Sequence, residues 1–248
     1  MKKLVFSKPP INEVMLGVVF NKLDSFTVPY FGLLWKEYEK ELPIVQQVRP
    51  IIDKKDATLE DITKTQRIWF IRSDYDNLLQ VQQDRIFSNW RRITGNPYPL
   101  YSELRKGFKK HYSQFQSFIK KNKLGQIKPV KYQLAYINHI ARDEQSLSCS
   151  LLEYFPNIFA KEAALQNISN INWRLNYEKI DNIGSLEIVI KPQKKDNKDI
   201  LLFELNVIGD AGVGVSMWKW YDSAHSYIRK TFLSLTSEKI QKKIWGKI

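Results

Sequence analysis

Twice along this chain, segments rich in β-forming residues precede a long amphipathic helix, and this repeated order constrains the fold more than any other feature. Helical spacing of apolar residues predicts one such helix over residues 102–120 and another over residues 221–235. A helix with one apolar face must bury that face against a sheet or another helix. The stripe of the first helix consists of Leu104, Phe108, Tyr112, Phe115 and Ile119. The order therefore predicts the α+β class.

The strand-like segments fall in a similar order in both parts of the chain. The first part has residues 14–20 and a hairpin of 67–71 with one long strand from Leu78 to about Trp90. The second part has residues 132–140 and a hairpin of 185–191 with 200–208. We expect two similar halves, each a curved antiparallel sheet packed on a long amphipathic helix. The expected N-terminal half is 1–124 and the C-terminal half 125–248, together forming one pseudo-duplicated unit.

Further elements are expected between these. Pro29 favours a helix start, and apolar residues at helical spacing continue that helix toward Pro43. Residues 146–154 are expected to form a strand paired with 132–140, followed by a short helix over 158–166. Another strand is expected over 171–177.

Composition limits the class of protein. Apolar residues make up 43% of the 248 residues and aromatic residues 13%, which indicates a packed core. Cys149 is the one cysteine, so neither an intramolecular disulfide nor a cysteine-built metal site is possible. No apolar run is long enough for a signal peptide or a membrane span. We expect a cytoplasmic protein without cofactor or metal that does not bind a membrane.

The positive charge is concentrated in one part of the chain. From Arg85 to Lys131 there are twelve Lys or Arg residues and one acid, Glu103. Such a field attracts nucleic acid, a nucleotide or an acidic protein partner, although a solvated helix face would carry the same pattern. The residues expected to bind polyanions are Arg91, Arg92, Arg105, Lys106, Lys109, Lys110, Lys120 and Lys121, with Trp90 and Tyr98 as interleaved aromatic residues.

The predicted long strand 78–90 is unusually polar. Because alternate residues of a strand share a face, Gln80, Gln82 and Asp84 would lie on one face and Gln83, Arg85 and Asn89 on the other. One interpretation is a strand with one solvated face and a buried arginine paired with a carboxylate. The other is that one of these two sets lines a polar pocket for a nucleobase or nucleotide, because buried amides need partners.

The same region carries a resemblance to a known family. The pattern comprises Pro9-Pro10-Ile11 with Glu13-Val14, Arg67-Ile68-Trp69-Phe70, Leu79-Gln80-Val81-Gln82 with Asp84-Arg85, Asn89-Trp90-Arg91, and Tyr98-Pro99 with Tyr101. It resembles a sporadically distributed bacterial family of uncharacterised proteins of similar length. The family's patchy distribution resembles that of genes in mobile elements or defence clusters, which implies an accessory, regulatory or antiviral role.

Catalytic motifs are absent from the sequence. His111, His139 and His225 have no second ligand at metal spacing, and the glycines of 209–214 lack the lysine of a phosphate-binding loop. We therefore favour a non-catalytic binding or regulatory protein over an enzyme, with nucleic acid or a nucleotide bound through the basic surface. The alternatives are a protein-interaction subunit of a larger assembly, and an enzyme or ligand-binding protein with a polar pocket around Arg85. The sequence leaves the oligomeric state open.

Overall fold

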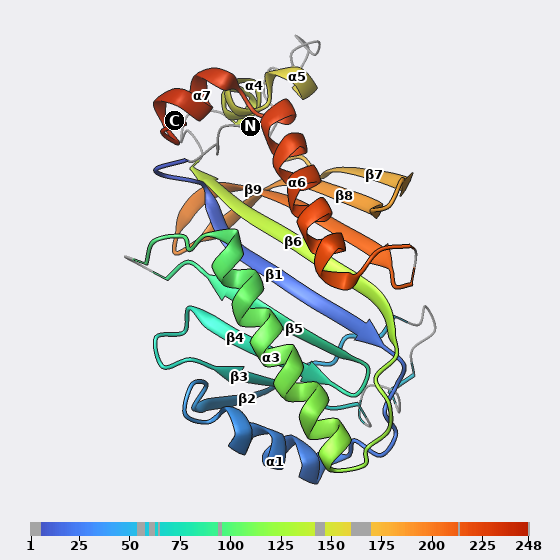
Figure 1. The fold of residues 1–248 in the computed structure, drawn as a ribbon. Helices are drawn as coiled ribbons and strands as arrows, with labels where there is room; N and C mark the ends of the chain where they lie inside the picture. Colours follow the sequence, from blue (N-terminus) through green and yellow to red (C-terminus); the bar gives the residue numbers. More distant parts are fainter. Residues whose placement is uncertain are drawn as a thin grey trace. The chain divides into compact units, whose positions relative to one another are not determined.

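Antiparallel strands and long helices make up a computed structural model of the protein, which describes residues 6–53, 58–59, 63, 65–93, 96–141, 147–159, 170–212 and 214–247 (Figure 1). The predicted α+β class is confirmed. The chain divides into two units, which are described separately. We call residues 13–133 with 210–213 the N-terminal unit, and residues 1–12, 134–209 and 214–248 the C-terminal unit. The expected division at residue 124 remains a prediction.

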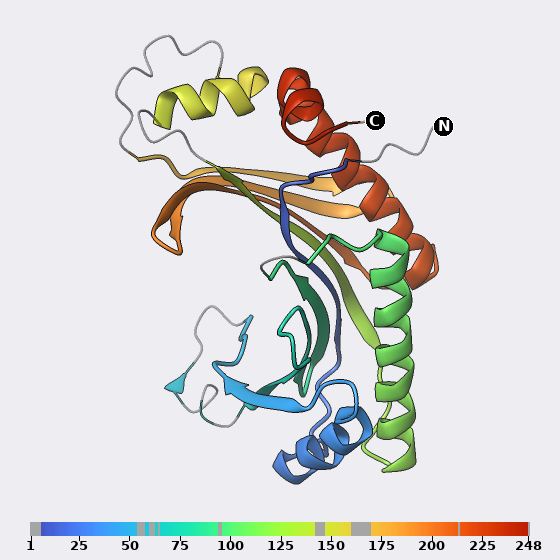
Figure 2. The same ribbon diagram turned by 90° about the vertical axis from the view of Figure 1, so that its left-hand side faces the viewer.

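The N-terminal unit is built on five strands in the order β2-β3-β4-β5-β1. Helices α1 and α3 lie against the sheet, and Figure 2 shows the strands curving with α3 on their convex side. The elements are β1 (Ile11–Phe20), α1 (Val28–Tyr38), β2 (Ile44–Val48), β3 (Arg67–Ile71), β4 (Asn77–Gln82), β5 (Arg85–Arg91) and α3 (Tyr101–Lys121).

One expected strand of this unit is wrong. Residues 78–90 form two antiparallel strands, β4 and β5, because Gln83 and Asp84 make a tight turn that pairs Gln82 with Arg85. Paired residues of a hairpin share a face, so the turn exchanges the odd and even positions. Gln80 and Gln82 thus lie on the same face as Arg85 and Asn89, away from the helices, instead of on opposite faces.

The helices cover the other face of this sheet with an aromatic core. Phe26 contacts Phe31, Phe115 and Phe118, with ring centroids 4.3, 5.9 and 6.4 Å away. Four residues of the stripe predicted for 102–120 are buried in α3, namely Phe108, Tyr112, Phe115 and Ile119, while Leu104 is half-buried. On the far face, a Cβ on Gly17 would lie 1.6 Å from Cδ1 of Phe87, so the Phe87 ring needs a glycine at this position.

Four strands in the order β6-β9-β8-β7 form the sheet of the C-terminal unit. Strand β6 begins in the N-terminal unit, at Pro129. The elements are β6 (Pro129–Ala141), α4 (Leu147–Tyr154), α5 (Pro156–Phe159), β7 (Trp173–Ile180), β8 (Gly184–Lys195), β9 (Lys198–Asp210), α6 (Met217–Leu235) and α7 (Glu238–Lys243). The register of β7 on β8 shifts between Tyr177 and Ile180, where Lys179 has φ 57°.

The core of the C-terminal unit centres on Phe203. Along β9, Leu201, Phe203, Leu205 and Val207 are all fully buried and alternate with more exposed residues, as expected for a strand with one apolar face. The Phe203 ring stacks on Phe232 of α6 at 5.7 Å. The apolar residues whose spacing predicted strand β9 and helix α6 are thus the residues through which the two elements pack.

Residues 146–154 were expected to be a strand, and this is wrong. Residues 147–154 form helix α4, because Leu147, Leu151 and Tyr154 have the spacing of a helix face and all three are buried. Most of the helix expected over 158–166 lies outside the described residues. No helix in the described parts of the chain is long and apolar enough to cross a membrane.

Candidate functional site

The exposed face of α3 carries a row of lysines. Lys106, Lys109, Lys110, Lys120 and Lys121 are all exposed, and at 100° per residue they fall within an arc of about 120°. At 1.5 Å per residue, the row from Lys106 to Lys121 is about 22 Å long. The apolar stripe of the helix faces the core, so its complement, the lysine face, is presented to solvent. We call these five residues the lysine face.

Two members of the lysine face are paired with carboxylates that follow or belong to α1. Lys110 Nζ donates to Glu41, and Lys121 Nζ lies 3.4 Å from Glu37. A hydrogen bond from the His111 side chain, aided by Lys110, lowers the pKa of Glu41 to about 2. One edge of the lysine face is therefore partly neutralised by glutamates of the same unit.

The other predicted polyanion-binding residues are distributed differently. Arg105 is half-buried on α3. Arg91 is the last residue of β5 and donates to the Tyr75 carbonyl, and Arg92 follows the strand. Trp90 is 3% exposed and packs edge-on against Tyr98 at 5.3 Å, so its ring belongs to the core. The basic residues of 85–131 thus do not form a single surface; those that share one exposed face are the lysines of α3.

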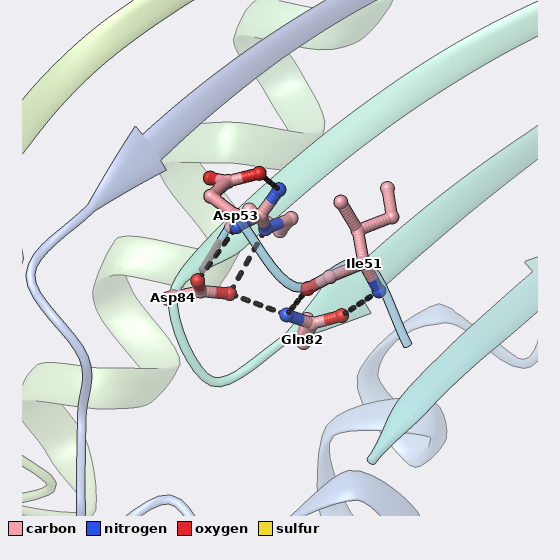
Figure 3. Close-up of polar contacts among 5 residues, drawn as sticks. Ile51, Asp53, Gln82 and Asp84 are labelled. Atoms are coloured by element: carbon pink, nitrogen blue, oxygen red, sulfur yellow. Dashed lines mark hydrogen bonds and ion pairs between the residues drawn. The ribbon is translucent and has the colours of Figure 1, made fainter. Parts of the chain in front are cut away.

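The buried Arg85 is fully engaged by the protein itself, and Figure 3 labels its partners Asp53 and Asp84. Its guanidinium donates to Asp84 at 2.8 and 3.0 Å and to Asp53 at 2.8 Å, and its side chain is 5% exposed. Gln82 accepts from the Ile51 amide at 3.0 Å and donates to the Ile51 carbonyl at 2.9 Å. These contacts attach the chain after β2 to the β4–β5 hairpin.

The remaining polar residues of this region also have protein partners. Gln80 donates to Asn89 at 2.6 Å and accepts from Arg67, and Asn89 donates to Glu13. Gln83 donates to the Phe26 carbonyl at 3.1 Å. We call Gln80, Gln82, Asp84, Arg85 and Asn89 with these partners the polar network. It satisfies the hydrogen-bonding needs from which a ligand pocket was inferred, in line with the alternative of a buried arginine paired with a carboxylate.

A cavity of about 470 Å³ lies elsewhere in the N-terminal unit, and the sequence did not suggest it. Its walls come from β1, β4, β5 and α3, from the β3–β4 turn, from the loop before α3 and from Glu41. The signals that could have pointed to it are a glycine inside α3, Gly107, and the acidic turn Asp74–Asp76. Neither signal predicts the cavity by itself, because the segments that form its walls are distant in sequence and come together only when the chain folds.

Metal chemistry has no support in the described ranges, where no group of three or more His, Cys, Asp or Glu residues is placed to hold an ion. Comparisons of the chain with models of protein families, with curated proteins and with solved structures gave no match.

Proposed function

We propose that the protein is a non-catalytic binding protein that takes up nucleic acid through the lysine face of α3. The observation that carries the proposal is the alignment of five exposed lysines on one side of a 21-residue helix. Lysines neutralise phosphates and release condensed counterions, which supplies most of the affinity of sequence-independent nucleic-acid binding. Ser113, Gln116 and Ser117 lie between the lysines on the same exposed side and are able to donate to phosphate oxygens.

Phosphate contact, without stacking of bases, is the mode that the lysine face favours. Trp90 was expected to offer a stacking surface, but its ring is buried. Single-stranded nucleic acid is usually held by aromatic platforms in addition to charge. The proposal therefore expects a steep dependence on salt and little dependence on sequence.

The test is a titration of a labelled DNA duplex of about 20 base pairs, followed by fluorescence anisotropy between about 50 and 200 mM salt. Four phosphate contacts would weaken binding about 100-fold over that range, since the logarithmic slope is about −0.9 per contact. Lys106→Gln with Lys120→Gln should reduce the slope by about 2. Lys194→Gln with Lys198→Gln, in the β8–β9 hairpin, removes the same charge elsewhere and is the matched control.

A salt-independent affinity, or an equal loss in the control variant, would refute binding through the lysine face. Glu37 and Glu41 show that carboxylates satisfy these lysines, so an acidic protein surface is the second candidate partner. A poly-glutamate chain that competes with the duplex at equal charge concentration would favour that candidate.

The polar network gives no support to a ligand pocket or an active site at Arg85, because its groups are occupied by one another. We propose a structural role for Gln80, Gln82, Gln83, Asp84, Arg85 and Asn89. Gln82 and Arg85 hold residues 51–53 to the hairpin, and the others bond within the hairpin or to neighbouring segments of the unit.

We also propose that the two units arose by duplication, each a curved sheet on a long helix. In both, a first strand is followed by a helix, then by further strands and a long helix, and the first strand neighbours the last (β1 beside β5, β6 beside β9). Membership of the sporadic bacterial family, a cytoplasmic location and a defence or mobile-element role remain proposals that rest on the sequence resemblance and the sequence alone. The neighbouring genes would test them.

A further inference from the structure

The cavity in the N-terminal unit has the size and the chemistry of a small-molecule site. Its volume of about 470 Å³ falls within the range usual for ligand pockets. Leu16, Trp90 and Leu104 form an apolar part of the wall, and polar side chains form the rest. Every lining residue belongs to the N-terminal unit.

The charge of the lining is opposite to that of the protein. Four carboxylates and one arginine border the cavity, in a chain whose formal net charge is +13. The carboxylates are Glu41, Asp74, Asp76 and Glu103, and the arginine is Arg72. Arg72 is already held by Asp74 at 2.8 Å and by Asp76, so it offers little to an anion. The cavity is a locally negative region that attracts cations.

Asp76 is the most buried of these carboxylates, with its side chain 7% exposed. Asn77 and Asn96 donate to it at 2.7 and 3.3 Å, in addition to Arg72. Burial raises the pKa of Asp76, which means that the folded protein disfavours the charged form of this carboxyl group. A cation in the cavity would offset that cost.

His111 lines the cavity on the side of α3 and is 7% exposed. Its Nε2 lies 3.1 Å from Glu41, which holds that carboxylate at the edge of the cavity.

Gly107 keeps space open on the helix side of the cavity. A glycine inside a helix costs about 1 kcal/mol relative to alanine. A Cβ at Gly107 would meet no atom within 4 Å, so packing does not require the glycine. Its absence of a side chain leaves room where α3 borders the cavity.

From the size of the cavity, its acidic lining and the space at Gly107, we infer that the cavity binds a compact organic cation with an amino or guanidino group. The cationic group lies among Glu41, Asp74 and Asp76 and donates hydrogen bonds to them, while the aliphatic part lies against Trp90 and Leu104. No member of the lysine face lines the cavity, and the two sites meet at Glu41, which lines the cavity and accepts from Lys110.

Isothermal titration of the full chain with agmatine, which carries both an amine and a guanidinium, tests the inference. Adipate, a dianion of similar length, is the charge control. Saturable 1:1 binding of agmatine and none of adipate is expected. Gly107→Leu should weaken agmatine binding tenfold or more, about 1.4 kcal/mol, by placing a side chain in the cavity. Gly32→Leu on α1, where a Cβ also meets nothing within 4 Å but the position is exposed and outside the lining, should bind as the parent does.

Asp74→Asn provides a second variant in case Gly107→Leu does not fold, since Asp74 is 51% exposed on a turn. It should weaken agmatine binding about two- to fivefold, the effect of one partly exposed charge. Absence of saturable binding by the folded parent would overturn the inference. So would adipate binding equal to that of agmatine, or agmatine binding to Asp74→Asn and Gly107→Leu with the affinity of the parent.

Discussion

Removing the carboxylates around Arg85 should destabilise the protein more than removing Arg85 itself. The three side chains differ in their access to water: that of Arg85 is 5% exposed, that of Asp84 29% and that of Asp53 67%. When Arg85→Met takes the cation away, both aspartates regain hydration. When Asp53→Asn and Asp84→Asn take the carboxylates away, the guanidinium stays buried and uncompensated.

The exposures set the expected magnitudes. A buried charge left without its partner costs about 3–5 kcal/mol, and we expect the double Asn variant near the lower end because the amides still accept hydrogen bonds. Arg85→Met loses charge-assisted hydrogen bonds but also the desolvation penalty of the guanidinium, so a loss of about 1–2 kcal/mol is expected. The difference between the two variants is about 2 kcal/mol.

Urea unfolding followed by tryptophan fluorescence measures both free energies, with Lys36→Met as a control at an exposed ion pair, where a loss of at most about 1 kcal/mol is expected. A larger loss for Arg85→Met than for the double Asn variant would refute the account of Arg85 as a buried cation held by solvated carboxylates. If Arg85→Met lost a binding activity without losing stability, Arg85 would instead be part of a ligand pocket.

Two further predictions concern stability. Gly17→Ala should lower the free energy of unfolding in urea by about 1–3 kcal/mol, because its Cβ would collide with the buried Phe87 ring. Gly32→Ala, at an exposed position of α1, should raise it by about 0.5–1 kcal/mol, and equal effects of the two changes would contradict the packing described. Burial and the nearby Arg229 lower the pKa of His225 to about 4, so the unfolded chain binds its proton first and the free energy of unfolding should fall as the pH drops from about 6.5 to 4. His225→Gln should reduce that fall by about 1–3 kcal/mol, and an unchanged pH profile would contradict it.

The long helices and the C-terminal hairpin followed from periodicity alone. In α3 and β9 the apolar residues keep one period throughout, so local pattern and tertiary burial agree. The β4–β5 turn could not be found in this way, because Gln83-Asp84 lacks the glycine or asparagine that marks most two-residue hairpins. Helix α4 was missed because its short apolar run fits either period.

The candidate sites divide along the same line. The lysine face of α3 is the complement of a predicted apolar stripe, so it was accessible from the sequence. The partners of Arg85 could not be predicted from the sequence, because Asp53 lies more than thirty residues away. In addition, the number of residues in the β4–β5 turn decides which face of the sheet each side chain of β5 takes. The cavity is formed by a turn, a helix end and a glycine that are separated in sequence, and no local sequence pattern predicts that they come together.

The irregular end of β7 has a consequence for behaviour at high concentration. Strand β7 ends the order of the C-terminal sheet, and the outer strand of a sheet exposes amide and carbonyl groups that recruit further strands. The register shift before Ile180 and the left-handed backbone of Lys179 interrupt the straight hydrogen-bonding edge. An apolar strand that paired there would also desolvate the charged side chains of Arg174, Glu178 and Lys179, which is unfavourable. This border of the sheet is therefore protected against self-templated fibre growth.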